Sequence, residues 1–454
     1  MTMAQRLGTA HVLRRETFTT SRVLDFCSER ELTKQIGHPS ALWPVVVLKE
    51  LVDNALDACE EADIVPVIDV AVRETNDASH IIIGDNGPGI PAETIRGMLD
   101  LTSRTSSREA YVSPTRGAQG NALKTIVSMG FALDGKRGET VIESQGLKHR
   151  IVLSTDPVRQ EPTFTHSPES SDVRIGTRVT MHWPVSSRSR LDDAQFQFLQ
   201  IADDYGWLNP HLTLRLQWDR LQWDEPFEFT STDPAWIKWK PNQPTSPHWY
   251  DPARLQRLMS AYARADQDRG REPRTVREFV SEFRGLAGTA KQKAVLDEIG
   301  AGRMSLDAYL QTGHVGSLLA AMKKQTKPVA AKHFGLIGAQ HLAARFEEFG
   351  AAPGTFKYKK LLGDCDGVPT VIETAFAYCP GHVGSRRIIL GINWSVCIGN
   401  PFRSLGRAGE SLDTILGKQH ANSDEPIIFV LHLARPVIDF TDHGKSAISL
   451  EEPA

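Results

Sequence analysis

Hydrophobic and polar positions follow two different periods in the first third of the chain. Residues 41–62 carry apolar side chains at helical spacing, and this pattern predicts an amphipathic helix. The segments VIDVAVRE (67–74) and SHIIIGD (79–85) predict a strand followed by a buried strand. Further helices are predicted over 92–100 and from Asn121, and further strands over 139–144, 148–154, 177–183 and 211–217. This order is typical of an α/β sandwich rather than of a regular βαβ repeat.

Beyond residue 218 the pattern changes twice. Residues 219–250 are rich in proline and tryptophan and are interpreted as an ordered connector, and residues 251–320 are helical in composition. From about residue 326, the strand-like segments PTVIETAFAY, RRIILGIN and PIIFVLHLA and a helix near 407–417 indicate a second α/β domain. Seven of the nine tryptophans lie between residues 183 and 249. Such a cluster could stack single-stranded bases, but core and linker packing is the favoured interpretation.

The composition of the chain narrows the classes of protein to which it can belong. The 454 residues are 40% hydrophobic and 24% charged, which is ordinary for a globular chain of about two to four domains. The net charge of −3 provides no global attraction to nucleic acid, so any DNA contact needs a local basic patch. The five cysteines form no C-x-x-C pair, which argues against a zinc site and a disulfide framework. Without a signal-peptide core or membrane span, the sequence predicts a cytoplasmic protein.

The predicted helix carries an unusual set of polar side chains. In KELVDNALDA (49–58), Glu50 and Asn54 are four residues apart, as are Asp53 and Asp57, so the pattern places all four on one helical stripe. A solvated face would normally include lysine, whereas this stripe is almost entirely acid and amide. Such a cluster suits a metal ion or the orientation of a water molecule.

Three glycine-containing segments follow. The buried strand runs into DNGPGI (85–90), where Asn-Gly alone indicates a hairpin turn, but the acid at the strand end, the longer loop and the following helix argue against a hairpin. Gly87 and Gly89 allow the backbone to approach a flat ligand, and Asp85 can accept a hydrogen bond from an exocyclic amine. In TRGAQGNALK (115–124), glycines precede a helix start and suit an anion, although a G-x-x-G is weak evidence alone. GTRVTM (176–181) carries no evidence by itself.

Together and in this order, E-x-x-x-N, D-x-G-x-G, the glycine segment and the late G-T resemble the Bergerat ATP-binding fold of the GHKL ATPases. The resemblance implies ATP and Mg²⁺ as cofactors, with Asn54 coordinating the metal and Glu50 acting as the general base. Asp53 and Asp57 are interpreted as supporting or surface groups rather than catalysts. Ala122 departs from the family pattern, which has a third glycine there. The other residues that the resemblance places at the nucleotide are Gly87, Gly89, Ser103, Arg104, Gly117, Ala118, Gln119, Gly120, Asn121, Ala122, Leu123, Lys124 and Thr177.

The rest of the chain resembles a narrower family, the B subunit of DNA topoisomerase VI, a type IIB enzyme. WLNPHLTLRL (207–216) resembles the end of its ATPase domain, and the segments at 246–259 and 275–300 resemble its helix–two-turns–helix insert. KPVAAKHFGLIGAQHL (327–342) resembles the entry to its transducer domain. FTDHGKSAI (440–448) resembles the transducer loop whose lysine, here Lys445, reaches the γ-phosphate of ATP. From sequence alone, an isolated lysine of this kind would be taken as a solvated surface group.

These observations give one expected architecture and function. The expected fold is multidomain α/β: a GHKL ATP-binding domain over 1–240, a helical domain over 241–320 and a transducer-like α/β domain over 321–454. The expected function is an ATP-hydrolysing, nucleotide-gated dimer that drives strand passage. DNA cleavage would need a separate A-type subunit with winged-helix and Toprim domains, because no cleavage domain is recognised in this sequence. The alternative is a standalone ATP-operated clamp or scaffold, MORC-like or part of a defence module, without topoisomerase activity.

Double-stranded DNA is the expected nucleic-acid partner, through local patches. RGLAG (284–288) with Thr289, Lys291 and Lys293 could present backbone amides to a phosphate, or could be a simple helical hairpin. MKKQTK (322–327) is the densest basic run and could line a DNA-facing surface or be merely solvated. No membrane partner is expected.

Overall fold

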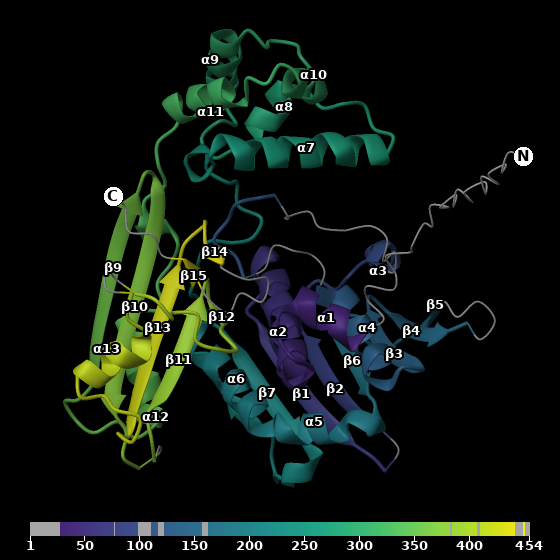
Figure 1. Cartoon of the computed structure of the whole chain (residues 1–454), viewed down its shortest axis with the longest axis vertical. Coiled ribbons are helices and arrows are strands. Elements are labelled where there is room, and N and C mark those ends of the chain that lie inside the picture. The colour runs from purple at the N-terminus through teal and green to yellow at the C-terminus, as the bar shows by residue number, and fades with distance from the viewer. Residues whose placement is uncertain are drawn as a thin grey trace, which may run out of the picture.

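The computed structural model contains two α/β parts and a helical part that lies between them in sequence (Figure 1). This arrangement confirms the expected multidomain α/β class. The first α/β part is built on an eight-stranded sheet and the second on a five-stranded sheet. The structure describes residues 28–76, 78–98, 110–116, 122–156, 162–381, 384–405, 409–440 and 448–449.

The first sheet has the strand order β5-β4-β3-β6-β2-β1-β7-β8. Among these strands only β1 and β7 pair in parallel, and all other neighbours are antiparallel. Three predicted strands have the observed bounds, and the other predicted strands of this sheet differ from the observed ones by one or two residues. The bounds are β1 Val67–Glu74, β2 Ser79–Asp85, β3 Arg137–Ser144, β4 Leu147–Thr155, β5 Pro162–Ser170, β6 Thr177–Trp183, β7 Thr213–Trp218 and β8 Phe227–Phe229.

Helices cover one face of this sheet. Alternate residues of β1 and β2 are buried there, as expected for strands with one face in a core. The opposite face carries ion pairs such as Arg73 with Asp219, at 2.6 Å. The helices of this part are α1 Glu29–Ile36, α2 Trp43–Glu61, α3 Ala92–Met98, α4 Ala122–Asp134, α5 Arg188–Asp193 and α6 Gln195–Leu208.

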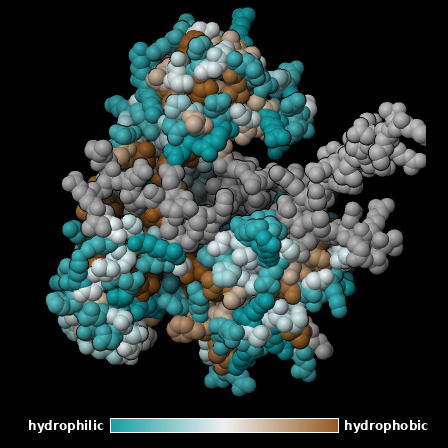
Figure 2. Space-filling model, viewed as in Figure 1, coloured by the Kyte–Doolittle hydropathy of each residue, from teal (hydrophilic) through white to brown (hydrophobic). Residues whose placement is uncertain are grey.

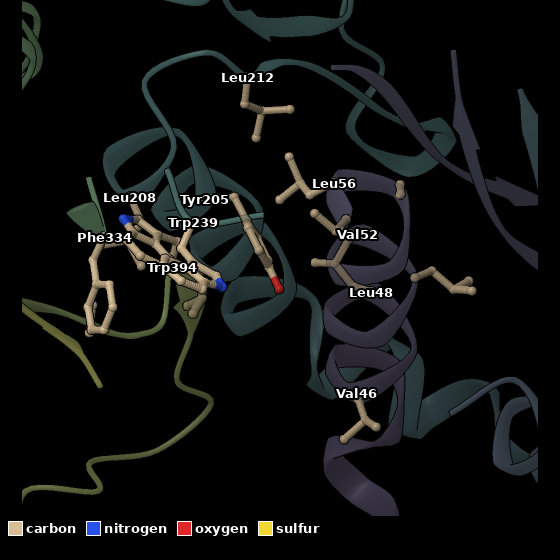
Figure 3. Packing of buried hydrophobic residues seen from close by; sticks show 14 of the residues in the cluster. Val46, Leu48, Val52, Leu56, Tyr205, Leu208, Leu212, Trp239, Phe334 and Trp394 are labelled. Atoms are coloured by element: carbon tan, nitrogen blue, oxygen red, sulfur yellow. The ribbon is translucent and has the colours of Figure 1, made fainter. Parts of the chain in front are cut away.

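Helix α2 is the central helix of this layer and packs against β2, α4 and α6. It confirms the helix predicted over 41–62, although residues 40–42 form a 3₁₀ turn before it. Pro44 lies in its first turn, where a missing N–H costs little. Figure 3 shows Leu48, Val52 and Leu56 along α2, with Tyr205 of α6 lying beside them.

The strands that the sequence pattern misses include β5, β8 and β9. Strand β5 reads PTFTHSPES, where proline and serine mask the alternation, and it pairs only with β4 at the sheet edge. Strand β9, Lys357–Cys365, is largely exposed and lysine-rich, which is typical of an edge strand that avoids pairing with other chains. Strand β8 has three residues and is too short for a period to appear.

The helical part lies above the two sheets in the view of Figure 1. It contains α7 Pro252–Asp268, α8 Val276–Ser281, α9 Thr289–Ile299, α10 Leu306–Gln311 and α11 Val315–Lys324. Thr275 and Glu278 form a capping box at the start of α8. In the connector that precedes the helical part, Trp239 packs edge-to-face on Trp249 with ring centroids 5.0 Å apart, and both rings contact Phe334. The packing interpretation of the tryptophan cluster is confirmed for the buried members Trp183, Trp207, Trp218, Trp239 and Trp249.

The second sheet has the order β12-β11-β13-β10-β9 and helices on both faces. Helix α12, Ala339–Glu348, packs with the main core, whereas α13, Leu412–Lys418, covers the other face through Leu412 and Leu416. The three strands predicted for this domain are observed, and α13 lies at the end of the predicted helix. The remaining strands are β10 Val368–Tyr378, β11 Arg387–Ile392, β12 Ser395–Val396 and β13 Ile427–Ala434, with a separate pair β14 Asp439–Phe440 and β15 Ile448–Ser449.

The surface in Figure 2 is predominantly hydrophilic, and its brown areas are broken up by teal. The strongly exposed apolar residues include Ile175, Phe196 and Ile237, which come from separate segments. Scattered exposure of this kind is normal for folded proteins. In the described part of the chain, no helix combines the length and apolar character needed to cross a membrane.

Candidate nucleotide site

The candidate base-binding group is Asp85, at the last position of β2. Its Oδ1 accepts hydrogen bonds from the backbone N–H of Gly87 at 2.8 Å and of Thr177 at 3.2 Å. Burial raises the pKa of the Asp85 carboxyl, and these two backbone donors partly offset the rise. Since both of these bonds end on Oδ1, Oδ2 can accept from a ligand amine.

Residues 176–177 pack directly against the DNGPGI loop. Gly176 has φ of +75°, and a Cβ at this position would lie 1.7 Å from the backbone oxygen of Asp85. Its N–H donates to the carbonyl of Gly87 at 2.9 Å. The late G-T pair, which carries no signal alone, therefore packs against the loop that holds Asp85 and supports its conformation.

Ser144 and Asn86 also stabilise this loop through hydrogen bonds, and neither residue was predicted as part of the site. The Ser144 hydroxyl accepts from the N–H of Ile90 at 2.7 Å and donates to the carbonyl of Gly176 at 3.2 Å. The Asn86 side chain ties the loop to residues 65–67, accepting from the N–H of Val67 at 2.9 Å. Only the "DNG" motif offered a signal for Asn86, and Ser144 had none because it comes from a distant strand.

Glu50 and Asn54 lie on the accessible side of α2. The Glu50 side chain is 33% exposed and Asn54 is exposed. The end of the same helix touches the loop that contains Asp85, because the Cys59 Sγ lies 3.5 Å from Asn86 Oδ1. One helix thus links a carboxylate and an amide to the loop that contains Asp85. Burial raises the pKa of the Cys59 thiol to about 12, so Cys59 is a packing group rather than a nucleophile.

The expected single stripe of four polar groups is wrong. Asp53 and Asp57 are 5% and 8% exposed, on the buried side of α2, whereas Asn54 faces outward. The pattern gave the correct spacing but not the boundary of the core, which is set by α6 and by the second sheet. Asp53 and Asp57 are therefore buried supporting groups, and the alternative that they are surface groups is excluded.

These two acids belong to a buried charge network centred on Arg116. The Arg116 side chain has no exposed surface, and its guanidinium donates to Glu60 through two nitrogens, both at 2.8 Å. It also donates to Asp57 at 3.0 Å, to Asn209, and to the carbonyl of Trp394 at 3.4 Å. All five N–H groups of Arg116 are thus used, which is the geometry in which a buried arginine is stable.

Several predicted residues lie outside the described part of the chain. These are Ser103, Arg104, Gly117, Ala118, Gln119, Gly120, Asn121 and Lys445. Ala122, Leu123 and Lys124 begin α4, and the Lys124 side chain is buried at 2% exposure. Among the described residues, no group of three or more histidine, cysteine or acidic side chains is arranged to hold a metal. A single protein ligand such as Asn54 is compatible with Mg²⁺, because this ion takes oxygen ligands and is usually bound by substrate phosphates together with few protein groups.

Comparison with protein families agrees with the geometry. Residues 41–187, which include α2, the Asp85 loop and the Gly176–Thr177 pair, match the family described as histidine kinase-, DNA gyrase B-, and HSP90-like ATPase. Among solved structures, the topoisomerase IV ATP-binding domain of Francisella tularensis in complex with a small-molecule inhibitor aligns over 88% of this chain and 80% of that chain. Its identity is 11% and its TM-score 0.33, a similarity too low to support an argument.

Curated relatives match part of the chain. The B subunit of type 2 DNA topoisomerase 6 from Archaeoglobus fulgidus is 29% identical over 170 residues, which cover 37% of this chain and 28% of the relative. The protein of the same name from Natronomonas pharaonis is 35% identical over 152 residues, covering 32% and 18%. That from Methanosarcina mazei is 44% identical over 84 residues, covering 18% and 13%. The matched segment therefore spans less than a third of the length of these relatives.

Proposed function

We propose, from the premise that this chain carries a GHKL ATPase domain with topoisomerase VI B-type relatives, that it binds and hydrolyses ATP as the nucleotide-gated dimerising subunit of a type IIB DNA topoisomerase. A separate A-type subunit would cleave double-stranded DNA. The observation that carries the proposal is the assembled site: α2 presents Glu50 and Asn54, and its end touches the loop that holds Asp85.

Glu50 is proposed as the general base. Its carboxylate is partly exposed on the same helix as Asn54 and one turn away, so Glu50 would be able to activate a water molecule beside the terminal phosphate of ATP bound near Asn54. Asn54 would hold Mg²⁺ through its amide oxygen. The metal, when bound with ATP, would neutralise charge that develops on the phosphates.

Asp85 is proposed to select the base. A partly buried carboxylate that already accepts two backbone hydrogen bonds is rigid, so it favours a ligand that presents a donor at one fixed point. The exocyclic amine of adenine is such a donor, whereas guanine presents a carbonyl oxygen there and would leave the carboxylate unpaired.

Eight residues that lie outside the described part enter this proposal on the sequence resemblance alone: Ser103, Arg104, Gly117, Ala118, Gln119, Gly120, Asn121 and Lys445. The same holds for the division into domains at 1–240, 241–320 and 321–454, and for DNA contact through the basic segments near 284–293 and 322–327. In this scheme Lys445 would contact the γ-phosphate from the second α/β domain and so distinguish ATP from ADP.

Replacement of Glu50 tests the proposal. Glu50→Gln should bind ATP like the parent but hydrolyse it about two to four orders of magnitude more slowly, because the water loses its base. Asn54→Ala should instead weaken Mg-dependent ATP binding. Steady-state ATPase rates and equilibrium binding of a fluorescent ATP analogue separate the two effects. Asp297→Asn removes an exposed acid from α9 and serves as the control. Unchanged turnover in Glu50→Gln would contradict the assignment.

A second candidate function is a standalone ATP-operated clamp. It is favoured by the limited extent of the topoisomerase similarity, which covers 37% of this chain in the Archaeoglobus relative. The two functions share the ATPase site but differ in the need for a cleavage subunit. Supercoil relaxation with ATP and a co-purified A-type subunit supports the topoisomerase, whereas ATPase activity without relaxation in that complex supports the clamp.

A further inference from the structure

The buried side of α2 is held by the second α/β domain as well as by its own. The Asp53 carboxylate accepts a hydrogen bond from the Tyr205 hydroxyl of α6 at 2.8 Å and from the Ser395 hydroxyl of β12 at 2.6 Å. Ser395 is 5% exposed. A hydroxyl from a strand about 340 residues away is therefore one of the groups that hold the acid one position before Asn54.

Lys49 connects this buried acid to Glu50. The Lys49 ammonium lies 2.9 Å from Asp53 Oδ2 and 3.4 Å from Glu50 Oε1. Burial lowers the pKa of Lys49, but the Asp53 and Glu50 carboxylates outweigh this effect and raise it, so the side chain stays charged. The Asp53 oxygen that holds Lys49 is the same Oδ2 that accepts from Ser395.

The turn that delivers Ser395 is unusually constrained. Asn393 and Trp394 have φ of +50° and +63°, both in the left-handed region, between β11 and β12. For a residue as large as tryptophan this backbone conformation is an outlier, and such strain persists where the surroundings hold it in place. The surroundings do so: the Trp394 N–H is paired with His432 at 3.2 Å, and its carbonyl accepts from Arg116.

We propose that Ser395 is a positioning residue for Glu50, acting through Asp53 and Lys49. This inference rests on the proposed function of Glu50. The Ser395 hydroxyl holds one Asp53 oxygen in place, which keeps the Lys49 ammonium shared between Asp53 and Glu50. If β12 moves away from α2, Asp53 loses this donor and Lys49 pairs with Asp53 alone. Glu50 then loses the group that orients it, so the position of the second domain controls the geometry of hydrolysis.

Ser395→Ala tests the inference because it removes one hydroxyl and no volume that the fold needs. The expected result is a kcat for ATP hydrolysis about three- to thirty-fold lower, with an unchanged KM, because Asn54 and Asp85 are untouched. Ser395→Thr retains the hydroxyl and should restore most of the rate. Gln197→Ala is the matched control: it removes a 3.0 Å hydrogen bond to the Ile398 carbonyl between α6 and the second domain, without a link to α2. It should leave kcat unchanged.

A double-mutant cycle with Asp53→Asn separates positioning from general loosening. If Ser395 acts through Asp53, Ser395→Ala should have little further effect on kcat in the Asp53→Asn background. Additive effects, or an equal loss of kcat in Gln197→Ala, would overturn the inference, as would a parent-like kcat in Ser395→Ala. A parent chain that does not hydrolyse ATP would instead overturn the proposed function and this inference with it.

Discussion

Asp85 shows how one motif residue is oriented by a residue from a distant segment of the chain. The position follows from "DNG" at a strand end, but its fixed orientation depends on the N–H of Thr177, about ninety residues further along the chain. That contact is possible only because β2 and β6 are neighbours in the sheet. The local sequence reveals the chemical group, whereas its orientation comes from strand pairing that the local sequence does not encode.

Removal of the Asp85 charge should weaken ATP binding and reduce its dependence on pH. Asp85→Asn should lower ATP affinity by about 1–3 kcal/mol, because the charged acceptor for the base amine is lost. In the parent, the pKa of the Asp85 carboxyl is raised, and the carboxyl ionises as the pH rises through this pKa. ATP affinity should therefore increase with pH over that range. Equilibrium binding between about pH 4 and pH 8 checks both effects. ATP affinity in Asp85→Asn that keeps the parental magnitude and pH dependence would exclude Asp85 from the base site.

At the scale of elements, α2 illustrates what periodicity can and cannot give. The helix and the spacing of Glu50, Asp53, Asn54 and Asp57 are predictable from the sequence. The division into an outer pair and a buried pair is not, because the buried pair is covered by Tyr205, Arg116 and Ser395 from three separate segments. Strands β5 and β9 were missed for a related reason: edge strands are half-solvated, so polar residues and prolines obscure their period.

Replacement of Arg116 should strongly reduce the stability of the contacts between these elements. This arginine bridges α2, the end of α6 and the β11–β12 turn, and its removal takes a guanidinium away from the buried carboxylates of Asp57 and Glu60, of which Glu60 keeps its ion pair with Lys238. Arg116→Met should therefore lower the free energy of unfolding by about 3–5 kcal/mol. Urea denaturation measures this loss.

Arg137→Ala is the control for Arg116→Met. It breaks a 2.9 Å ion pair with Glu139 whose arginine is 56% exposed, and it should cost less than about 1 kcal/mol. Similar losses in the two variants would mean that the buried network contributes no more to stability than a surface pair does.

For the whole molecule, composition and pattern predicted two α/β parts joined by a helical part, and the structure has this order. How the two α/β parts contact each other could not be predicted, because the contacts join isolated residues rather than periodic segments. One such contact is Arg387 of β11, which lies between Asp203 and Asp204 of α6. Neither α6 acid belonged to a motif, and an arginine at a strand start is usually solvated.

This contact predicts a pH-dependent interface between the two α/β parts. Burial, together with the neighbouring Asp203 charge, raises the pKa of Asp204 to about 7 in the folded protein, although Arg387 opposes the rise. In the unfolded chain an aspartate titrates near pH 4. Between about pH 4 and pH 7 the folded state thus retains a proton that the unfolded state loses, so stability should fall as pH rises, by up to about 4 kcal/mol.

Asp204→Asn should remove this slope while keeping an acceptor for Arg387. The difference in free energy of unfolding between the variant and the parent should therefore grow in favour of the variant from about pH 4 to pH 7, and stay constant above pH 8. Urea denaturation at five or six pH values measures the difference, and Asp193→Asn, at the exposed end of α5, is the control. Parallel pH profiles for Asp204→Asn and the parent would show that Asp204 remains ionised beside Arg387. In that case the two α/β parts would be joined by a full ion pair whose strength does not change over physiological pH.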